Sequence, residues 1–232
     1  RELAEYDEVD VLSIPSRHVE AGFLAKGFAP HRLARNVLGV DLDEFPHSQG
    51  PGAGPLEVVF VGAFSRRKGC DLWLEAAARM PTIRFTHVGP AGDVAPATLD
   101  NVSHIPAVPQ HELHRFYALA DVLTLPSRED GFGLVMSQAL ASGCHVVGTD
   151  KTGAPDLSEL TGDAVTVLPA GDLEALIAHL AALDARRQAL RADRRSKAHW
   201  REALSWRAYA ERYLAMLEER LSARRRPGRA SS

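Results

Sequence analysis

The sequence has few cysteines, no long apolar run and no excess of charge of one sign. Its two cysteines, Cys70 and Cys144, lie far apart, so neither a disulfide scaffold nor a cysteine metal cluster is expected. No apolar run approaches the roughly 18 residues that a membrane-spanning helix requires. The 27 Lys and Arg against 30 Asp and Glu give a formal net charge of −3, which does not suggest a nucleic-acid partner. These absences favour a reducing, cytoplasmic setting.

The sequence does contain an ordinary globular composition, 45% hydrophobic and 25% charged. Residues 1–45 hold a strand-like run at Val9–Ser16 and a helix-like segment near His18–Lys26. Residues 46–55 are rich in proline, glycine and polar residues, which indicates a linker. The chain begins with Arg1 rather than methionine, so we expect it to be part of a longer protein.

From Leu56 onward, apolar strand-like runs alternate with helical patterns. Strands are predicted at Leu56–Gly62, Ile83–Gly89, Val102–Val108, Asp121–Ser127, His145–Asp150 and Ala164–Ala170. Helices are predicted at Asp71–Arg79, Gln110–Ala120, Leu134–Gly143 and Asp172–Leu183. This alternation predicts an α/β fold, a doubly wound parallel sheet with Rossmann-like topology. Ligands of such sheets bind outside the carboxyl ends of the strands, so the loops after Gly62, Gly89, Ser127 and Thr149 should surround one crevice.

The most informative segment is Leu125–Val147, in which a strand, a glycine-containing loop and a helix follow one another. Such a loop points backbone N–H groups and the positive end of a helix at the crevice, so an anion is the expected guest. Gly131 and Gly133 would let the backbone come close to a ligand. Asp130 and Gln138 are about two helical turns apart, so both can line one edge of a pocket. The alternative is that Asp130 only caps the helix and Gln138 lies on the surface.

A second loop follows the strand at Leu56–Gly62 and carries Arg67, Lys68 and Gly69 ahead of a helix. Two cations at a crevice mouth suit a diphosphate, because a guanidinium can bond it bidentately. Basic surface loops are common, so this pattern alone is weak evidence for a ligand site. It is stronger together with the Gly131 loop, because both loops would converge on one crevice.

Two segments together resemble a known family. VGAFSRRKG (residues 61–69) and PSREDGFGLVMSQALASGCHVVGTDKTGAPDL (residues 126–157) resemble the donor-binding domain of family 4 glycosyltransferases, which are retaining enzymes of the GT-B fold. The EDGFG loop resembles that of one branch of this family. The resemblance implies five segments. Residues 1–45 would be the end of an N-terminal acceptor domain and the passage out of it, and residues 46–55 a linker. Residues 56–204 would form a nucleotide-sugar donor-binding domain, residues 205–221 a closing helix and residues 222–232 a basic disordered tail.

The resemblance also implies roles for single residues. Lys68 and Asp130 would be catalytic. The donor diphosphate would be held by five residues, namely Arg67, Lys68, Gly131, Phe132 and Gly133. The family usually has an arginine where this sequence has Ala63, and Arg67 would substitute for it.

Two acidic positions of the family are changed. Asp130 and Gln138 stand where the family has two glutamates, the first contacting the donor sugar and the second the ribose hydroxyls. Asp130 keeps the charge but is one methylene shorter, so Glu129 beside it is a second candidate for the donor sugar. Gln138 can still accept a hydrogen bond from the ribose, at a loss of roughly 1 kcal/mol relative to a charge-assisted bond.

The implied reaction is retaining transfer of a sugar from a nucleotide-diphosphate donor to a sugar or lipid-linked acceptor. Cations and amides would stabilise the negative charge that grows on the leaving diphosphate. The nucleotide-sugar is a substrate, and neither a tightly bound cofactor nor a metal is expected. Asp41–Asp43 has a metal-like spacing but falls in the interdomain passage, and His111 and His114 lack a third ligand.

The implied partners are the donor, the acceptor and a missing N-terminal domain that supplies the acceptor site, so this chain alone should transfer sugar poorly. A lipid-linked acceptor would bring the protein to the inner face of the cell membrane as a peripheral contact. Two alternatives stay open. One is a non-catalytic nucleotide-sugar-binding module, which Ala63 and the changed Asp130 and Gln138 would favour. The other is a GT-B-shaped nucleotide-sugar epimerase, which would need acid–base carboxylates and histidines in the crevice.

Overall fold

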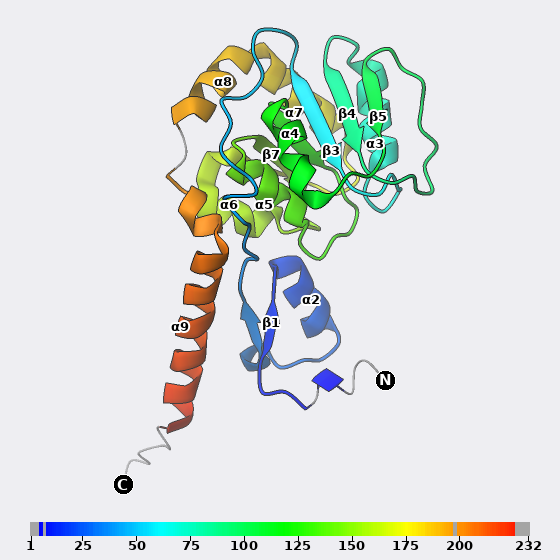
Figure 1. The fold of residues 1–232 in the computed structure, drawn as a ribbon. Coiled ribbons are helices and arrows are strands. Elements are labelled where there is room, and N and C mark those ends of the chain that lie inside the picture. Colours follow the sequence, from blue (N-terminus) through cyan, green and yellow to red (C-terminus); the bar gives the residue numbers. More distant parts are fainter. Residues whose placement is uncertain (1–4, 7, 197–198, 226–232) are drawn as a thin grey trace.

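The computed structural model describes residues 5–6, 8–196 and 199–225. Figure 1 shows a large α/β unit, a small unit beneath it, and a long helix that runs beside the small unit toward the C-terminus. Residues 1–4 of the predicted N-terminal segment and residues 226–232 of the predicted tail lie outside the described residues.

The large unit is built on six parallel strands within the described part of the chain. These are β3 (Glu57–Val61), β4 (Arg84–Val88), β5 (Val102–Ile105), β6 (Val122–Leu125), β7 (His145–Thr149) and β8 (Val165–Leu168). Their order in the sheet is β5-β4-β3-β6-β7-β8, and every neighbouring pair is parallel. This is the Rossmann strand order, so the predicted α/β fold with a doubly wound sheet is confirmed. The chain winds outward in both directions from β3 and β6.

Helices flank the strands. They are α3 (Cys70–Arg79), α4 (Leu113–Ala118), α5 (Leu134–Ala141), α6 (Ala154–Thr161), α7 (Leu173–Ala185) and α8 (Arg187–Ser196). Short 3-10 turns lie at Pro30–Arg32, Gln110–Glu112, Gly162–Ala164 and Arg201–Leu204. Helix α3 contacts α7, and α4 contacts α5. Two helices were not predicted. Helix α6 is only eight residues long and has a proline as its second residue, and α8 is polar on most of its surface, so neither shows a regular apolar stripe.

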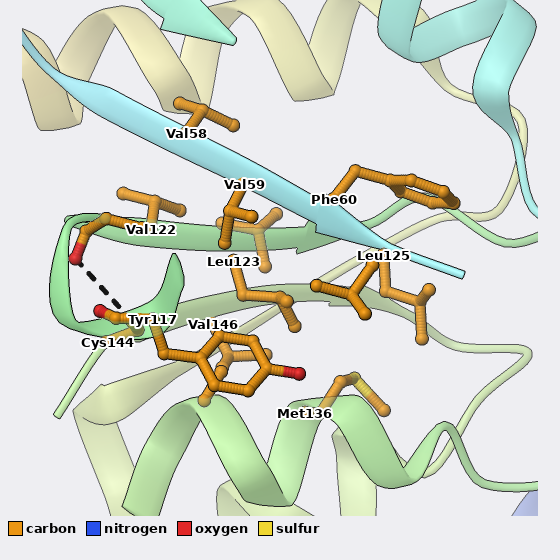
Figure 2. Packing of buried hydrophobic residues seen from close by; sticks show 14 of the residues in the cluster. Val58, Val59, Phe60, Tyr117, Val122, Leu123, Leu125, Met136, Cys144 and Val146 are labelled. Carbon is orange, nitrogen blue, oxygen red and sulfur yellow. Dashed lines mark hydrogen bonds between the residues drawn. The ribbon is translucent and has the colours of Figure 1, made fainter. Parts of the chain in front are cut away.

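The core lies between the sheet and these helices. Figure 2 shows side chains of β3 and β6 meeting Tyr117 of α4 and Met136 of α5. All four residues of β6 are buried. Trp73 of α3 is fully buried against Phe60 and Phe64, as expected of a tryptophan that packs helix against sheet. The continuous apolar strands follow from burial on both faces, which is typical of parallel sheets.

Strand β5 ends earlier than its pattern suggested, whereas α5 is closed by the glycine at which its pattern ended. Strand β5 stops at Ile105 because Pro106 has no N–H to donate to a neighbouring strand. Helix α5 stops at Ala141, and Gly143 then adopts a left-handed conformation with φ +93°. The N–H of Cys144 reaches back to the carbonyl of Ala139, which completes a glycine-terminated helix end.

The small unit consists of β1 (Leu12–Ile14), α2 (Arg17–Ala25) and β2 (Leu33–Arg35), and its two strands pair in parallel. The predicted linker at residues 46–55 contains neither helix nor strand. Helix α8 holds it in place, because Arg191 donates to the carbonyls of Gly54 and Pro55 and Arg194 donates to that of Ser48.

Helix α9 (Trp206–Arg225) connects the two units. Arg212 donates to the carbonyl of Val37, and Arg220 donates to that of Leu33, so α9 is fastened along the small unit. The helix continues past residue 221, so residues 222–225 belong to it and not to the predicted disordered tail. In the described part of the chain, no helix is long and apolar enough to cross a membrane.

Candidate functional site

The candidate site lies where the winding of the sheet reverses, between β3 and β6. These strands pair directly, with Val58 opposite Val122. The loops that leave their carboxyl ends, residues 62–69 and 126–133, therefore start side by side. This is the position at which open α/β sheets form a ligand crevice, and it brings together the two loops that the sequence singled out.

Hydrogen bonds to backbone carbonyls join these two loops. The N–H of Arg128 donates to the carbonyl of Arg67 at 2.9 Å, and the Arg67 guanidinium donates to the carbonyl of Glu129 at 2.9 Å. Gly69 has φ +76°, and a Cβ there would lie 2.0 Å from the carbonyl oxygen of Pro126. Only glycine permits so close an approach.

Lys68 and Asp130 form an ion pair across the join, between Nζ and Oδ2. Their side chains are only 16% and 14% exposed. The structure thus brings together the two residues predicted to be catalytic, which are 62 positions apart. The Lys68 charge is compensated by Asp130, so an anion entering here would compete with this carboxylate.

The loop that follows Asp130 is held through its backbone. The Asp130 N–H donates to the carbonyl of Lys151 at 3.0 Å, and the Gly153 N–H donates to the carbonyl of Phe132 at 2.8 Å. The Phe132 N–H lies 3.4 Å from Asp130 Oδ1, while its ring is buried in the core. Gly131 and Gly133 are half-buried, and among the described residues none accepts a hydrogen bond from their amides. These two amides can therefore serve a ligand.

Helix α5 begins at Leu134, directly after Gly133, which has φ +80° and makes no side-chain cap. Gln138 is 3% exposed, and its Oε1 accepts from the Tyr117 hydroxyl at 3.0 Å. The alternative that Asp130 merely caps this helix while Gln138 lies on the surface is therefore wrong. The Tyr117 bond uses one of the two acceptor positions of the Gln138 oxygen.

One ion pair at the site was not predicted from the sequence. Arg128 donates from two nitrogens to the two carboxylate oxygens of Asp71 at 2.7 and 2.9 Å, which fixes the second loop to the start of α3. Burial by itself would raise the pKa of Asp71, but the bonds and charge of Arg128 outweigh it and hold the pKa below its ordinary value. No sequence pattern links two residues 57 positions apart, so only the fold could reveal this pair.

The residues with metal-like spacing make local contacts. Asp41 accepts from the backbone N–H groups of Asp43 and Glu44 at 2.9 and 3.1 Å, so it caps its own turn. His114 Nδ1 lies 2.6 Å from the carbonyl oxygen of His111. Across the described residues, no group of three or more His, Cys, Asp or Glu side chains converges as a metal site would require.

A cavity of about 100 Å³ lies elsewhere, between α8 and the amino ends of β6 and β7. None of the predicted site residues lines it. We assign the candidate site to the carboxyl ends of β3 and β6 instead, because that is where the unpaired amides and the Lys68–Asp130 pair meet.

Comparison with solved structures shows a shared fold. Sucrose-phosphate synthase from Thermosynechococcus elongatus superposes with a TM-score of 0.72 over 96% of this chain and 61% of its own, at 22% identity. Anabaena Alr3699/HepE in complex with UDP and glucose gives a TM-score of 0.70 over 90% of this chain and 63% of its own, at 14% identity. At these identities the likeness concerns architecture, and it agrees with the GT-B expectation.

Sequence comparison gives nearer relatives. D-inositol 3-phosphate glycosyltransferase of Segniliparus rotundus is 33% identical over 230 residues, which cover 87% of this chain and 51% of that protein. The protein of the same name from Mycolicibacterium smegmatis is 34% identical over 172 residues, which cover 64% of this chain and 39% of that protein. The chain thus spans about half the length, or less, of these two relatives. The family model for glycosyl transferases group 1 matches residues 55–185, more than half of the chain. The chain therefore belongs to the group 1 glycosyl transferases.

Proposed function

We propose that this chain supplies the nucleotide-sugar donor site of a retaining glycosyltransferase. The observation that carries the proposal is the Lys68–Asp130 pair, set beside the unpaired amides of Gly131 and Gly133. One cation and two free amides at the reversal of a Rossmann-like sheet form a site for an anionic group.

In this proposal Lys68, Arg67 and the amides of the Gly131–Gly133 loop hold the donor diphosphate. The Arg67 guanidinium is exposed and uses one N–H on Glu129, so its other N–H groups can reach a phosphate. These groups stabilise the charge that develops on the leaving diphosphate. Ala63, where the family usually has a cation, contributes none.

The ion pair between Asp130 and Lys68 opens as the donor binds, and each side chain then contacts the donor. An incoming diphosphate draws the Lys68 ammonium to itself and leaves the Asp130 carboxylate free to accept from a sugar hydroxyl. Glu129, which is exposed, is a second acceptor for the sugar. Gln138 accepts from a ribose hydroxyl through the acceptor position of its oxygen that Tyr117 does not use.

The donor and acceptor are proposed by class. UDP is the first nucleotide to try, because a structural neighbour was solved in complex with UDP and glucose. The acceptor is a sugar or a lipid-linked sugar, bound with the help of an N-terminal domain that the longer relatives have room for. We place the protein in the cytoplasm, at the inner membrane face if the acceptor is lipid-linked, with no tightly bound cofactor or metal.

The test is calorimetric titration of the chain with UDP, GDP and ADP, repeated on Lys68→Ala. One nucleotide should bind, and the substitution should weaken it at least tenfold, which corresponds to about 1.4 kcal/mol. Lys26→Ala removes the same side chain from the far end of α2 and should leave the affinity unchanged. Binding that is indifferent to Lys68 would contradict our placement of the diphosphate, and no binding by a folded chain would contradict a donor site in this chain alone.

Turnover separates the proposal from the two alternatives that the sequence left open. A full-length protein should transfer sugar from the nucleotide that binds to an acceptor. Release of a free epimer would favour the epimerase, and binding without turnover would favour a non-catalytic module. The family match and the similar proteins favour neither alternative.

A further inference from the structure

The amino end of α2, in the small unit, contacts the Asp130–Gly133 loop of the large unit. The Ser16 side chain is 0% exposed. Its hydroxyl donates to the carbonyl of Gly131 at 2.5 Å and accepts from the N–H of Val19 at 3.2 Å. Ser16 therefore caps its own helix and binds a loop that lies 115 positions away in sequence.

A second contact keeps this end of α2 in place. Asp156 of α6 is 3% exposed and accepts from the Arg17 N–H at 3.0 Å and from the Arg35 guanidinium at 2.8 Å. Arg35 also pairs with Glu20 of α2 at 3.1 Å. The residue next to Ser16 is thus fastened to a helix of the large unit, which fixes the position of the Ser16 hydroxyl.

The bond from Ser16 has a consequence for the loop because a peptide group is planar. Its C=O and N–H point in opposite directions. With the Gly131 carbonyl turned toward Ser16, the N–H of Phe132 must point the other way, and there it reaches Asp130 Oδ1. The next peptide is fixed in turn, because the Phe132 carbonyl accepts from Gly153.

We propose that Ser16 is a positioning residue for the donor site. It orients the Gly131–Phe132 peptide. Through the Phe132 amide it also fixes the position of the Asp130 carboxylate, which pairs with Lys68. Ser16 acts through these groups and does not itself touch the donor. The inference rests on the proposed function, because it assigns the loop that Ser16 holds to the donor diphosphate and sugar.

The test must separate this role from helix capping. Ser16→Gly removes the hydroxyl while costing a helix only a few tenths of a kcal/mol, since glycine is tolerated as an N-cap. Asp172→Gly is the matched control, because Asp172 caps α7 by accepting from Ala175 at 2.9 Å and α7 does not carry the loop. Ser16→Thr keeps the hydroxyl, and its extended backbone, with φ −156°, suits a β-branched residue.

Two readouts are taken on the full chain. The first is residue-specific amide hydrogen exchange by NMR at Asp130 and Gly153, whose N–H bonds anchor the loop. Ser16→Gly should speed exchange at both amides about tenfold, whereas Ser16→Thr and Asp172→Gly should leave it within twofold of the wild type. The second is the affinity for UDP, which Ser16→Gly should lower severalfold and the other two variants should not.

The outcomes distinguish the two proposals. Unchanged exchange at both amides in Ser16→Gly, or an equal change in Asp172→Gly, would overturn the positioning role whatever binds. Faster exchange with an unchanged UDP affinity would overturn its link to the donor. Faster exchange in Ser16→Gly, together with a wild-type chain that binds no nucleotide, would count against the proposed function and leave the positioning of the loop supported.

Discussion

At the scale of single residues, the sequence predicts which side chains can bind an anionic ligand, but not which side chains pair with one another. Lys68, Asp130 and the two loop glycines stand out in the sequence because cations, carboxylates and glycines beside strands suit anionic ligands. The sequence gives no sign that Lys68 is paired with Asp130 in the free protein. That pairing arises because β3 and β6 are neighbours, and it changes what each substitution should do.

Asp130→Asn should tighten UDP binding severalfold. The amide no longer holds Lys68 and no longer repels the incoming diphosphate, so the cation is free for the ligand. Glu129→Gln removes a charge from the preceding residue, whose side chain is exposed, and should change the affinity much less. Calorimetry compares the two variants, and weaker binding by Asp130→Asn would show that the carboxylate supports the nucleotide.

At the scale of elements, hydrophobic periodicity predicted the strands and the helices with apolar stripes. It failed for α6 and α8, whose positions depend on contacts made elsewhere. Gly153 at the start of α6 illustrates the difference. A Cβ there would lie 2.3 Å from the Phe132 ring, so α6 and the Asp130–Gly133 loop are packed against each other.

Gly153→Ala should destabilise the chain by about 1–3 kcal/mol, the usual cost of adding a methyl group to a filled space. Thermal unfolding should show a melting temperature lower by a few degrees. Gly22→Ala is the matched control, because this glycine lies within α2 with no atom within 4 Å of its added Cβ. It should raise stability by about 0.5–1 kcal/mol. A neutral Gly153→Ala would show that the loop can move away from α6.

At the scale of the whole molecule, the two units are joined by polar contacts and by α9. Asp156 is the most buried charge at the join, because it serves both the backbone of Arg17 and the guanidinium of Arg35. This arrangement matters to function because α2 also holds the loop of the candidate site. The contacts between the two units and the candidate site are therefore connected through α2.

Asp156→Ala should lower stability by about 1–3 kcal/mol, less than a fully buried pair would cost, because Arg35 is 34% exposed and can be rehydrated. Glu174→Ala breaks the exposed Arg79–Glu174 pair and should have no measurable effect. Urea unfolding of both variants gives the comparison. Equal stabilities would show that α9 alone keeps the small unit in place.

Stability should also depend on pH through one buried histidine, His87, and three half-buried ones, His47, His104 and His179. Burial lowers the pKa of His47, His87, His104 and His179. A histidine whose folded pKa is lowered contributes stability above its unfolded pKa of about 6.5 and loses that contribution as the pH falls toward the folded pKa. The melting temperature should therefore decrease as the pH is lowered from 7.5 to 5.5.

His87→Gln should make this decline shallower. Its amide can still donate to the Gly62 carbonyl, from which His87 Nε2 lies 2.9 Å, and it does not titrate. His111→Gln, on an exposed turn, should follow the wild type. A melting temperature that does not change with pH would contradict the burial of these rings as neutral groups.

The sequence by itself determined the α/β class, the number of strands in the large sheet and the glycine loops, because hydrophobic periodicity and backbone freedom are local properties. It also placed Lys68 and Asp130 in two loops expected at one crevice. Only the tertiary structure decided the Arg128–Asp71 pair, the burial of Gln138 against Tyr117 and the contact between Ser16 and Gly131. Each of these depends on which segments, far apart in sequence, lie side by side in the folded chain. No local pattern encodes that choice, since it follows from the packing of the whole chain.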